Sequence, residues 1–548
     1  MCLKKKWGTL CLLSLVGSIA FAGGPAHVPQ VPVWDRFELS LQSQNLYDNP
    51  LYDVRAFFAR VTSPSGKTTE IRGFWDGGKQ WKIRLMPDEV GTWSYRTYCS
   101  DTLNAGLHEV AGSFQCLENH SELAIYTHGR VEREQGNYHL NHADGSPFFW
   151  QACTAWNGGL KSSEQEWETY LKHRARNGYN VIQLVATQWR GCAANSQGEV
   201  AFTGSGKMVL NPGFFQHFDR KMDQVNAHGQ VAGLVMLWAL PFGPGTELSP
   251  GYYLPDREAI LLARYLVARY GAHHVAWILG GDGRYVGELE DRWMHIGREV
   301  FKDKPQGLST LHPYGGSWVG EIYGQEPWYD IDGYQSSHGT GKRTIEFINR
   351  TVAEGWKSNP PKPVINLEPC YEEIRMAIFE DDVRNACYWS VFATPPGGIT
   401  YGADGIWPWI REGEKPLNHR YVPGVSTWDK AMDLPGSFQV AYLGAFMRDY
   451  AWWNLRPAQD LLLEQPGEEH FRAHVSLLKS LDSKTILVYL PTRQEVSLRL
   501  PSARTYTAKW FDPVENSYRD ADVRWEGRKL QAQSPLEKDA VLVLTAAE

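Results

Sequence analysis

Residues 275–282 read VAWILGGD, an apolar run (Val275–Leu279) that ends in two glycines and an aspartate. A short run of this kind is typical of a strand buried on both faces of a parallel sheet. Similar runs recur between about residues 121 and 455, and we expect each to form a strand of the same sheet. They span Phe148–Cys153, Val181–Ala186, Val231–Trp238, Leu308–Leu311, Ile331–Tyr334, Val364–Leu367 and Gly398–Tyr401.

The segments between these runs are predicted to be helical. Residues 163–166, SEQE, have the spacing of a capping box, which begins a helix. Asp256 precedes Arg257–Tyr270, where apolar residues recur at helical spacing, and Phe379–Phe392 is similar. Strand–helix units repeated over about 300 residues predict a (β/α)8 TIM barrel across residues 121–455, which is an α/β fold. A doubly wound open sheet is the competing fold.

The chain on either side of this region has the alternation of β-structure. Trp81, Ile83 and Leu85 occupy every second position, as expected of a half-buried strand. Turn sequences such as DGG at 76–78 separate these runs, so we expect an N-terminal β-sandwich over residues 31–120. Strand-like runs return at 485–490, 495–500, 505–511 and 540–544, which predicts a second, C-terminal β-sandwich over residues 458–548.

The composition is that of a globular protein with an excess of aromatic residues. Hydrophobic residues make up 43% of the 548 residues and charged residues 21%, with a net charge of −7. The acidic balance argues against a nucleic acid partner. The 23 Trp, 26 Tyr and 21 Phe can build large cores or stack on the apolar faces of sugar rings. Composition alone leaves both uses open and specifies no oligomeric state.

Residues 1–22 are predicted to be an export signal. Lys4–Lys6 are basic, Leu10–Ala20 is apolar, and Ala20-Phe21-Ala22 is a small-x-small cleavage site, so the mature chain should begin near Gly23. A retained membrane anchor is the alternative, although the apolar stretch is short for a bilayer. Because no later apolar run is long enough, we expect no membrane span after signal removal, and a periplasmic or extracellular location in a bacterium.

The cysteines beyond the signal leave two interpretations open. They are Cys99, Cys116, Cys153, Cys192, Cys370 and Cys387. An even number in an oxidising compartment permits disulfides, with Cys99 and Cys116 as one sequential pair, and free buried thiols fit equally well. The chain has no CxxC motif and no His/Cys spacing typical of zinc. We therefore predict no metal and no cofactor.

Two of the predicted strands end in an acid. Asp282 follows the run at 275–279, and Glu368 follows the run at 364–367. Catalytic groups of TIM barrels lie at the C-terminal ends of the strands, and two opposed carboxylates are what cleavage of a glycosidic bond requires. A turn role for Asp282, in an Asp-Gly pair, and a structural salt bridge for Glu368 are the alternatives. We predict that Asp282 and Glu368 are catalytic.

Other strand ends carry aromatic and hydrogen-bonding side chains that suit a carbohydrate. Because these ends converge on one face of a barrel, we expect their side chains to bind the substrate, although core packing is the alternative for any single aromatic residue. The predicted substrate-binding residues are Trp156, Asn157, Gln188, Trp189, Trp238, Arg284, His312, Tyr314, Gln335, His338, Tyr371, Tyr401, Asp404 and Trp407.

Several motifs resemble those of a known family, the apiosidase-like (β/α)8 glycoside hydrolases. In the barrel these are TAW at 154–156, WILGGD at 277–282, NLE at 366–368 and YGADGIW at 401–407. GFWDG at 73–77 looks like the β-sandwich that precedes many secreted glycosidases, and KWFDP at 509–513 is similar to a β domain of the collagen-binding type. The resemblance implies a retaining glycosidase with Asp282 as acid/base and Glu368 as nucleophile.

One position departs from the family pattern. Relatives carry Gly-Asp-Thr-Ala-Trp in the first strand, where this chain reads Ala152-Cys153-Thr154-Ala155-Trp156. The missing acid is expected to bind a sugar hydroxyl, so the resemblance does not extend to apiose as the sugar.

The sequence therefore predicts an exported glycoside hydrolase that acts on a polysaccharide or complex glycan. The alternative is a non-catalytic carbohydrate- or matrix-binding protein on a TIM-barrel scaffold, which would keep the aromatic residues and need neither carboxylate.

Overall fold

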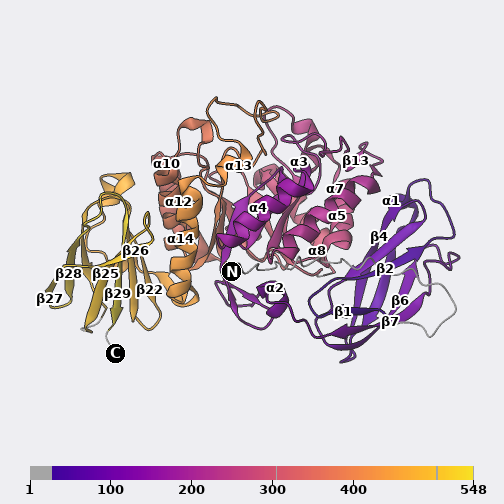
Figure 1. Cartoon of the computed structure of the whole chain (residues 1–548), viewed down its shortest axis with the longest axis horizontal. Helices are drawn as coiled ribbons and strands as arrows, with labels where there is room; N and C mark the ends of the chain where they lie inside the picture. The colour runs from indigo at the N-terminus through magenta and orange to yellow at the C-terminus, as the bar shows by residue number, and fades with distance from the viewer. Residues whose placement is uncertain (1–27, 304, 502–503, 547–548) are drawn as a thin grey trace, which may run out of the picture.

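The computed structural model describes residues 28–303, 305–501 and 504–546. Figure 1 shows three parts in a row: an N-terminal β part in indigo, a central part with strands and helices, and a C-terminal β part in yellow. The predicted export signal lies outside the described residues.

The central part is a parallel barrel. Its strands are β11 (Trp150–Thr154), β12 (Val181–Val185), β15 (Val231–Trp238), β16 (Val275–Gly283), β17 (Leu308–Pro313), β18 (Asp332–Gln335), β19 (Val364–Glu368) and β20 (Pro396–Tyr401). The first strand of this set, β11, pairs in parallel with both β12 and β20, so the sheet curls round on itself. All eight strand predictions are confirmed to within a few residues at their ends, and the open-sheet alternative is wrong.

The remaining seam of the barrel lies between β17 and β18, and side chains and loop backbone bridge it. The Asp330 N–H donates to the Ser309 carbonyl at 2.8 Å. The Thr310 hydroxyl donates to the Ile331 carbonyl, also at 2.8 Å. These bonds hold β17 beside β18, which matters because both strands carry residues of the site described below.

Helices cover the outside of the barrel. The longer ones are α4 (Glu164–Arg176), α5 (Pro212–Ala227), α7 (Asp256–Tyr270), α8 (Glu290–Phe301), α12 (Glu380–Phe392) and α14 (Pro435–Asp449). The shorter ones are α3 (Gly158–Lys161), α6 (Pro250–Tyr253), α9 (Gly320–Tyr323), α10 (Lys342–Glu346), α11 (Ala353–Gly355), α13 (Trp428–Ala431) and a π-helical turn at Phe347–Val352. The predicted capping box of α4 is confirmed, since the Ser163 side chain accepts from Glu166 N and Glu166 accepts from Ser163 N.

A short segment closes the end of the barrel where the strands begin. It contains α2 (Ala124–Thr127), β8 (Val131–Arg133), β9 (Leu140–His142) and β10 (Pro147–Phe148). Ile125, Val131 and Leu140 are buried in one cluster with Val181 and Val231, the first residues of two barrel strands. This end is therefore sealed by apolar packing.

The N-terminal part contains β1 (Gln30–Pro32), β2 (Phe37–Gln42), β3 (Phe57–Thr62), β4 (Thr68–Gly77), β5 (Gln80–Leu85), β6 (Gly91–Cys99), β7 (Ala111–Leu117) and the short helix α1 (Pro50–Asp53). The first half of β4 pairs with β3 and its second half with β5, so β4 passes from one layer to the other. At the crossing, a Cβ on Gly73 would lie 2.2 Å from the Phe57 ring, so only glycine fits.

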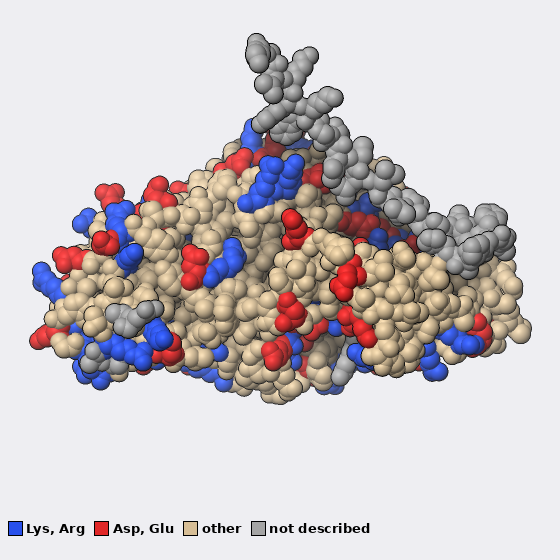
Figure 2. Space-filling view, turned by 60° about the horizontal axis from the view of Figure 1, so that its bottom comes forward, with Lys and Arg blue, Asp and Glu red and all other residues tan. Residues whose placement is uncertain are grey.

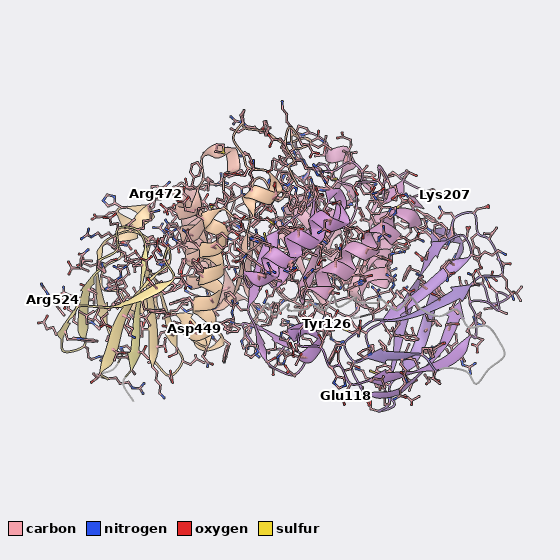
Figure 3. The ribbon with its side chains drawn as sticks, viewed as in Figure 1. Glu118, Tyr126, Lys207, Asp449, Arg472 and Arg524 are labelled. Atoms are coloured by element: carbon pink, nitrogen blue, oxygen red, sulfur yellow. The ribbon has the colours of Figure 1, made fainter. Side chains whose placement is uncertain are left out.

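The C-terminal part contains β21 (Leu455–Pro457), β22 (Ser476–Ser480), β23 (Thr485–Leu490), β24 (Glu495–Arg499), β25 (Tyr506–Asp512), β26 (Ser517–Asp520), β27 (Val523–Glu526), β28 (Lys529–Gln533) and β29 (Ala540–Ala546). They form a six-stranded and a three-stranded sheet around a shared apolar core. Arg384 of α12 anchors this part to the barrel, because its Nε lies 2.9 Å from both carboxylate oxygens of the buried Asp539. Arg472, labelled in Figure 3, adds an exposed contact of 3.2 Å to Asp382 at the same junction.

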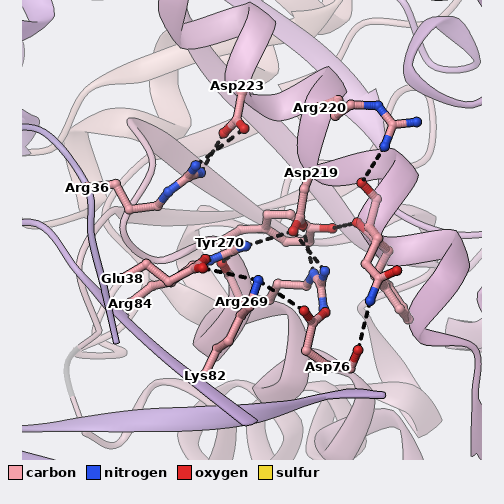
Figure 4. A network of polar contacts seen from close by, with 12 residues as sticks. Arg36, Glu38, Asp76, Lys82, Arg84, Asp219, Arg220, Asp223, Arg269 and Tyr270 are labelled. Carbon is pink, nitrogen blue, oxygen red and sulfur yellow. Dashed lines mark hydrogen bonds and ion pairs between the residues drawn. The ribbon is translucent and has the colours of Figure 1, made fainter. Parts of the chain in front are cut away.

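A buried network of charges joins the N-terminal part to the barrel (Figure 4). Asp219 of α5 accepts from Arg84 of β5 at 2.7 Å, and from Arg269 of α7 through two bonds of 2.7 Å. Arg269 also lies 2.8 Å from Asp76 of β4. Burial alone would raise the pKa of Asp219, but the two guanidinium groups outweigh it and hold that pKa well below its usual range.

The six cysteines of the described residues are free and buried. The predicted pairing of Cys99 with Cys116 is wrong, because the two residues lie at opposite ends of the β6–β7 ladder. Cys116 faces Gly91, which is roughly 26 Å along β6 from Cys99 at about 3.3 Å per residue. A disulfide requires Cα atoms within about 7 Å of each other.

Acidic and basic side chains alternate over the face drawn in Figure 2, without a large patch of one sign. Among the helices of the described residues, none combines the length and the apolar character needed to cross a bilayer.

We predict that Asp219→Asn destabilises the protein by about 3–5 kcal/mol. The substitution replaces the anion that Arg84 and Arg269 share by a neutral amide, and both guanidinium groups stay buried. Urea denaturation followed by tryptophan fluorescence measures this. Glu70→Gln is the matched control, since Glu70 pairs with Arg60 in an ion pair that is about half exposed on both sides, and its loss should change the midpoint little. If the two substitutions destabilised the protein equally, the buried network would not be what stabilises the contact between the N-terminal part and the barrel.

Candidate active site

Asp282 lies near the C-terminal end of β16, in a backbone conformation that side-chain-bearing residues rarely adopt (φ 51°). Glycines precede and follow it. A Cβ on Gly281 would lie 2.6 Å from the Trp238 ring, and one on Gly283 would lie 2.2 Å from the Tyr285 ring. The glycines are thus required by aromatic rings of the protein itself, and left-handed backbone at a non-glycine residue is typical of functional sites.

Glu368 is the last residue of β19 and is almost fully buried. Two histidines face its carboxylate. His338, which follows β18, places Nε2 2.8 Å from Oε1, and His312, on β17, places Nε2 3.1 Å from Oε2. Glu368 is therefore the shared partner of two imidazoles.

His312 lies between the two acids. The backbone N–H of Asp282 donates to His312 Nδ1 at 3.3 Å, so in the neutral ring the proton is on Nε2, which faces Glu368. Each of the three residues has a ligand-type atom within 4.8 Å of the others, so the two carboxyl groups are close neighbours. Among the described residues, the group whose ligand atoms lie close enough together to hold a metal ion consists of Asp282, His312 and Glu368.

The two acids have opposite pKa shifts. Burial, together with the negative charge of Glu368, raises the pKa of Asp282 to about 6. Burial would also raise the pKa of Glu368, but the close approach and charge of His312 and His338 outweigh it and hold that pKa well below its usual range. His312 in turn has a raised pKa, because its contact with Glu368 outweighs its own burial. At mildly acidic pH the pair thus consists of one neutral acid and one anion.

Both acids face a cavity of about 420 Å³ at the C-terminal ends of the strands. Of the predicted binding residues, those that line it are Trp156, Trp189, Trp238, Tyr314, Gln335, His338, Tyr371, Asp404 and Trp407. The ring centroids of Trp189 and Trp238 lie 4.1 Å apart, and those of Trp156 and Trp238 lie 5.6 Å apart. These three indole rings form a continuous aromatic wall on one side of the cavity.

Five predicted binding residues do not line the cavity. Asn157 is buried and accepts from Trp189 Nε1 at 2.8 Å, so it holds a wall residue in place. Gln188 is buried and bonds the backbone of Phe202 and Ala201. His312 contacts both acids but has no exposed surface, so it does not line the cavity.

The other two lie further from the cavity. The Tyr401 hydroxyl donates to the buried Glu372 at 2.7 Å, which directs it away from the cavity. Arg284 follows Asp282 by two residues and is exposed to solvent outside the lining.

Further lining residues lie in the loops that follow the strands and were not predicted from the sequence, although Arg190, Gly315 and Ser337 each adjoin a predicted residue. They are Arg190, Leu240, Phe242, Gly315, Ser337, Ile374, Arg375, His419 and Arg420. Only their position a few residues beyond a strand could have indicated them. His419 is 230 residues from Trp189 in the sequence, yet the centroids of their rings lie 6.1 Å apart. Burial lowers the pKa of His419 to about 4.

Comparisons with known proteins identify the family of the central part and the fold. The family model "Apiosidase-like, catalytic domain" matches residues 134–454, and a domain of unknown function, DUF5060, matches residues 30–100. No curated protein matches the chain.

Solved structures share the fold. A glycoside hydrolase is 24% identical with a TM-score of 0.66, over 77% of this chain and 98% of its own. A glycoside hydrolase family 5 protein from Bacteroides vulgatus is 22% identical with a TM-score of 0.66, over 77% of this chain and 94% of its own. A third protein, provisionally assigned as a glycoside hydrolase from the same species, is 16% identical with a TM-score of 0.67, over 95% of this chain and its whole length.

The family model covers more than half of the chain and includes both acids, the two histidines and most of the aromatic wall. The chain therefore belongs to the apiosidase-like family of glycoside hydrolases.

Proposed function

We propose that the protein is an exported retaining glycosidase in which Asp282 is the general acid/base and Glu368 the nucleophile. The single observation that supports this most is the close approach of two acids with opposite pKa shifts, within 4.8 Å at the end of a lined cavity. Retaining enzymes have carboxyl groups about 5–5.5 Å apart, whereas inverting enzymes leave about 6.5–9.5 Å for a water molecule.

In the first step, Glu368 Oε attacks the anomeric carbon while the bond from that carbon to the glycosidic oxygen breaks. The carboxyl proton of Asp282 moves to the departing oxygen. In the second step, Asp282 accepts a proton from water, the water oxygen attacks the anomeric carbon, and Glu368 leaves as a carboxylate. His338 and His312 stabilise the Glu368 anion before the first step and after the second.

The cavity supplies the contacts expected of a sugar site. Trp156 and Trp407 present apolar ring surface, and Gln335, His338 and Asp404 present hydrogen-bonding groups around Glu368. We propose that these residues hold the sugar whose anomeric carbon reacts. Tyr371 is positioned by Trp156, whose Nε1 donates to its hydroxyl oxygen at 2.7 Å.

A substitution pair separates the roles of the two acids. With the glycan that wild type cleaves best in a polysaccharide panel, both Asp282→Asn and Glu368→Gln should lower kcat by about 10³-fold or more. With the glycosyl fluoride of the released sugar, whose leaving group needs no proton, Asp282→Asn should recover most of its kcat/KM, which reports the first step, whereas its kcat stays low because the second step needs Asp282 as base; Glu368→Gln should recover neither. Recovery by Glu368→Gln instead would reverse the assignment.

The pH dependence follows from the two shifts. Asp282 must be protonated and Glu368 ionised, so kcat/KM should fall as the pH rises through about 6, where Asp282 loses its proton. Glu368 stays ionised well into the acidic range because its pKa is lowered. The pH profile of kcat/KM measures this, and the residual activity of Asp282→Ala should lack the alkaline limb. A profile that stays flat to pH 9 would contradict Asp282 as the acid.

Export rests on the basic and apolar segments at Lys4–Lys6 and Leu10–Ala20 and on the small residues at Ala20 and Ala22. We predict that the full chain, expressed in a Gram-negative bacterium, is recovered from the periplasm or medium with an N-terminus at Gly23. N-terminal sequencing of the recovered protein tests this, and a chain that retains residues 1–22 in the membrane fraction would support an anchor instead.

A further inference from the structure

One large apolar side chain at the cavity is left in contact with solvent. The Phe242 side chain is 57% exposed. Other large apolar side chains of the described residues are also exposed to solvent, and Phe242 is the one of them that lines the cavity. It follows β15 by four residues. Exposed aromatic rings at the mouth of a cavity are typical of surfaces that bind a ligand.

Phe242 has an aromatic neighbour on the far side of the strand that carries Asp282. Tyr314 follows β17, lines the same cavity, and lies with its ring centroid 6.3 Å from that of Phe242 in an edge-to-face arrangement. The Tyr314 N–H donates to the Gly283 carbonyl at 3.2 Å, which places it directly beside the end of β16. β15 and β17 are the two neighbours of β16 in the sheet, so the two rings, which contact each other, come from the segments on either side of the strand that carries Asp282.

The backbone around Phe242 is held in place. Arg190 donates from Nε to the Pro244 carbonyl at 3.2 Å and from Nη2 to the Asn418 carbonyl at 3.0 Å. Asn418 Nδ2 donates back to the Arg190 carbonyl at 2.9 Å. Arg190 thus connects the loop of Phe242 to the loop of Asn418, so hydrogen bonds hold the segment that carries the Phe242 ring in place.

The position of the acid decides which part of the substrate meets these rings. A general acid in a glycosidase lies beside the glycosidic oxygen, and that oxygen leaves with the aglycone. Side chains from the segments next to Asp282 are therefore expected on the leaving-group side, whereas His338 contacts Glu368, and Asp404 and Trp407 follow β20, the neighbour of β19.

We propose that Phe242 and Tyr314 form the binding platform for a sugar ring on the leaving-group side of the cleaved bond. The inference rests on the proposed function of Asp282. The substrate class that it names is a glycan in which the released sugar is linked to another sugar, whose apolar C–H face packs on the Phe242 ring. A glycoside with a small leaving group does not use this platform.

The test compares two substrates that share the released sugar. One is an oligosaccharide from the glycan that wild type hydrolyses, and the other is the corresponding glycosyl fluoride, whose leaving group has no ring. Phe242→Ala should lower kcat/KM for the oligosaccharide roughly tenfold, in line with the loss of one aromatic contact, and leave the fluoride unchanged. The unchanged fluoride rate also shows that the variant is folded.

Two further variants sharpen the comparison. Phe242→Trp should keep oligosaccharide activity within about twofold of wild type, because it retains a flat apolar ring. Tyr252→Ala is the matched control, since Tyr252 is 47% exposed in the same connection after β15 but does not line the cavity. It should be neutral on both substrates.

The outcomes are distinguishable. Equal loss on both substrates, or no loss on either, overturns the platform while the proposed function stands. A wild type that hydrolyses neither an oligosaccharide nor a fluoride from the panel overturns the proposed function, and the platform falls with it.

Discussion

Two carboxyl groups within 4.8 Å of each other in a buried site cannot both carry a negative charge without a large electrostatic penalty. The histidines determine which one does. His312 and His338 both direct Nε2 to Glu368, whereas Asp282 offers His312 its backbone N–H. The charge therefore settles on Glu368 and the proton on Asp282. One neutral acid and one anion are the two forms that glycosidic cleavage requires.

The fold supplies this arrangement from consecutive barrel strands. β16, β17 and β19 contribute Asp282, His312 and Glu368, and the loop after β18 contributes His338. The helices that cover these strands are fixed from outside by buried ion pairs. Asp219 of α5 and Arg269 of α7 bind the N-terminal part, and Arg384 of α12 binds the C-terminal part.

Apolar periodicity was sufficient to predict the barrel strands and the position of Asp282 and Glu368 at the ends of two of them, because each buried strand is a continuous apolar run. Side-chain direction was not predictable in the same way. Gln188 follows a strand, as Trp189 and Asp404 do, and Tyr401 ends one, yet Gln188 bonds to Phe202 and Tyr401 to Glu372, and both turn away from the cavity. Loop residues such as Arg190, Phe242 and His419 reach the cavity through tertiary contacts that no local pattern contains. The separation of Cys99 from Cys116 likewise follows from strand register, which the sequence does not specify.

The central claim is that Glu368 forms a covalent bond to the sugar, which requires that the anomeric configuration be retained. Proton NMR of the reaction from its first minutes identifies the anomer that appears before mutarotation. The account predicts that the first product has the same anomeric configuration as the bond that was cleaved. A first product of the opposite configuration would contradict it, because that outcome requires direct attack by water and leaves Glu368 as a base.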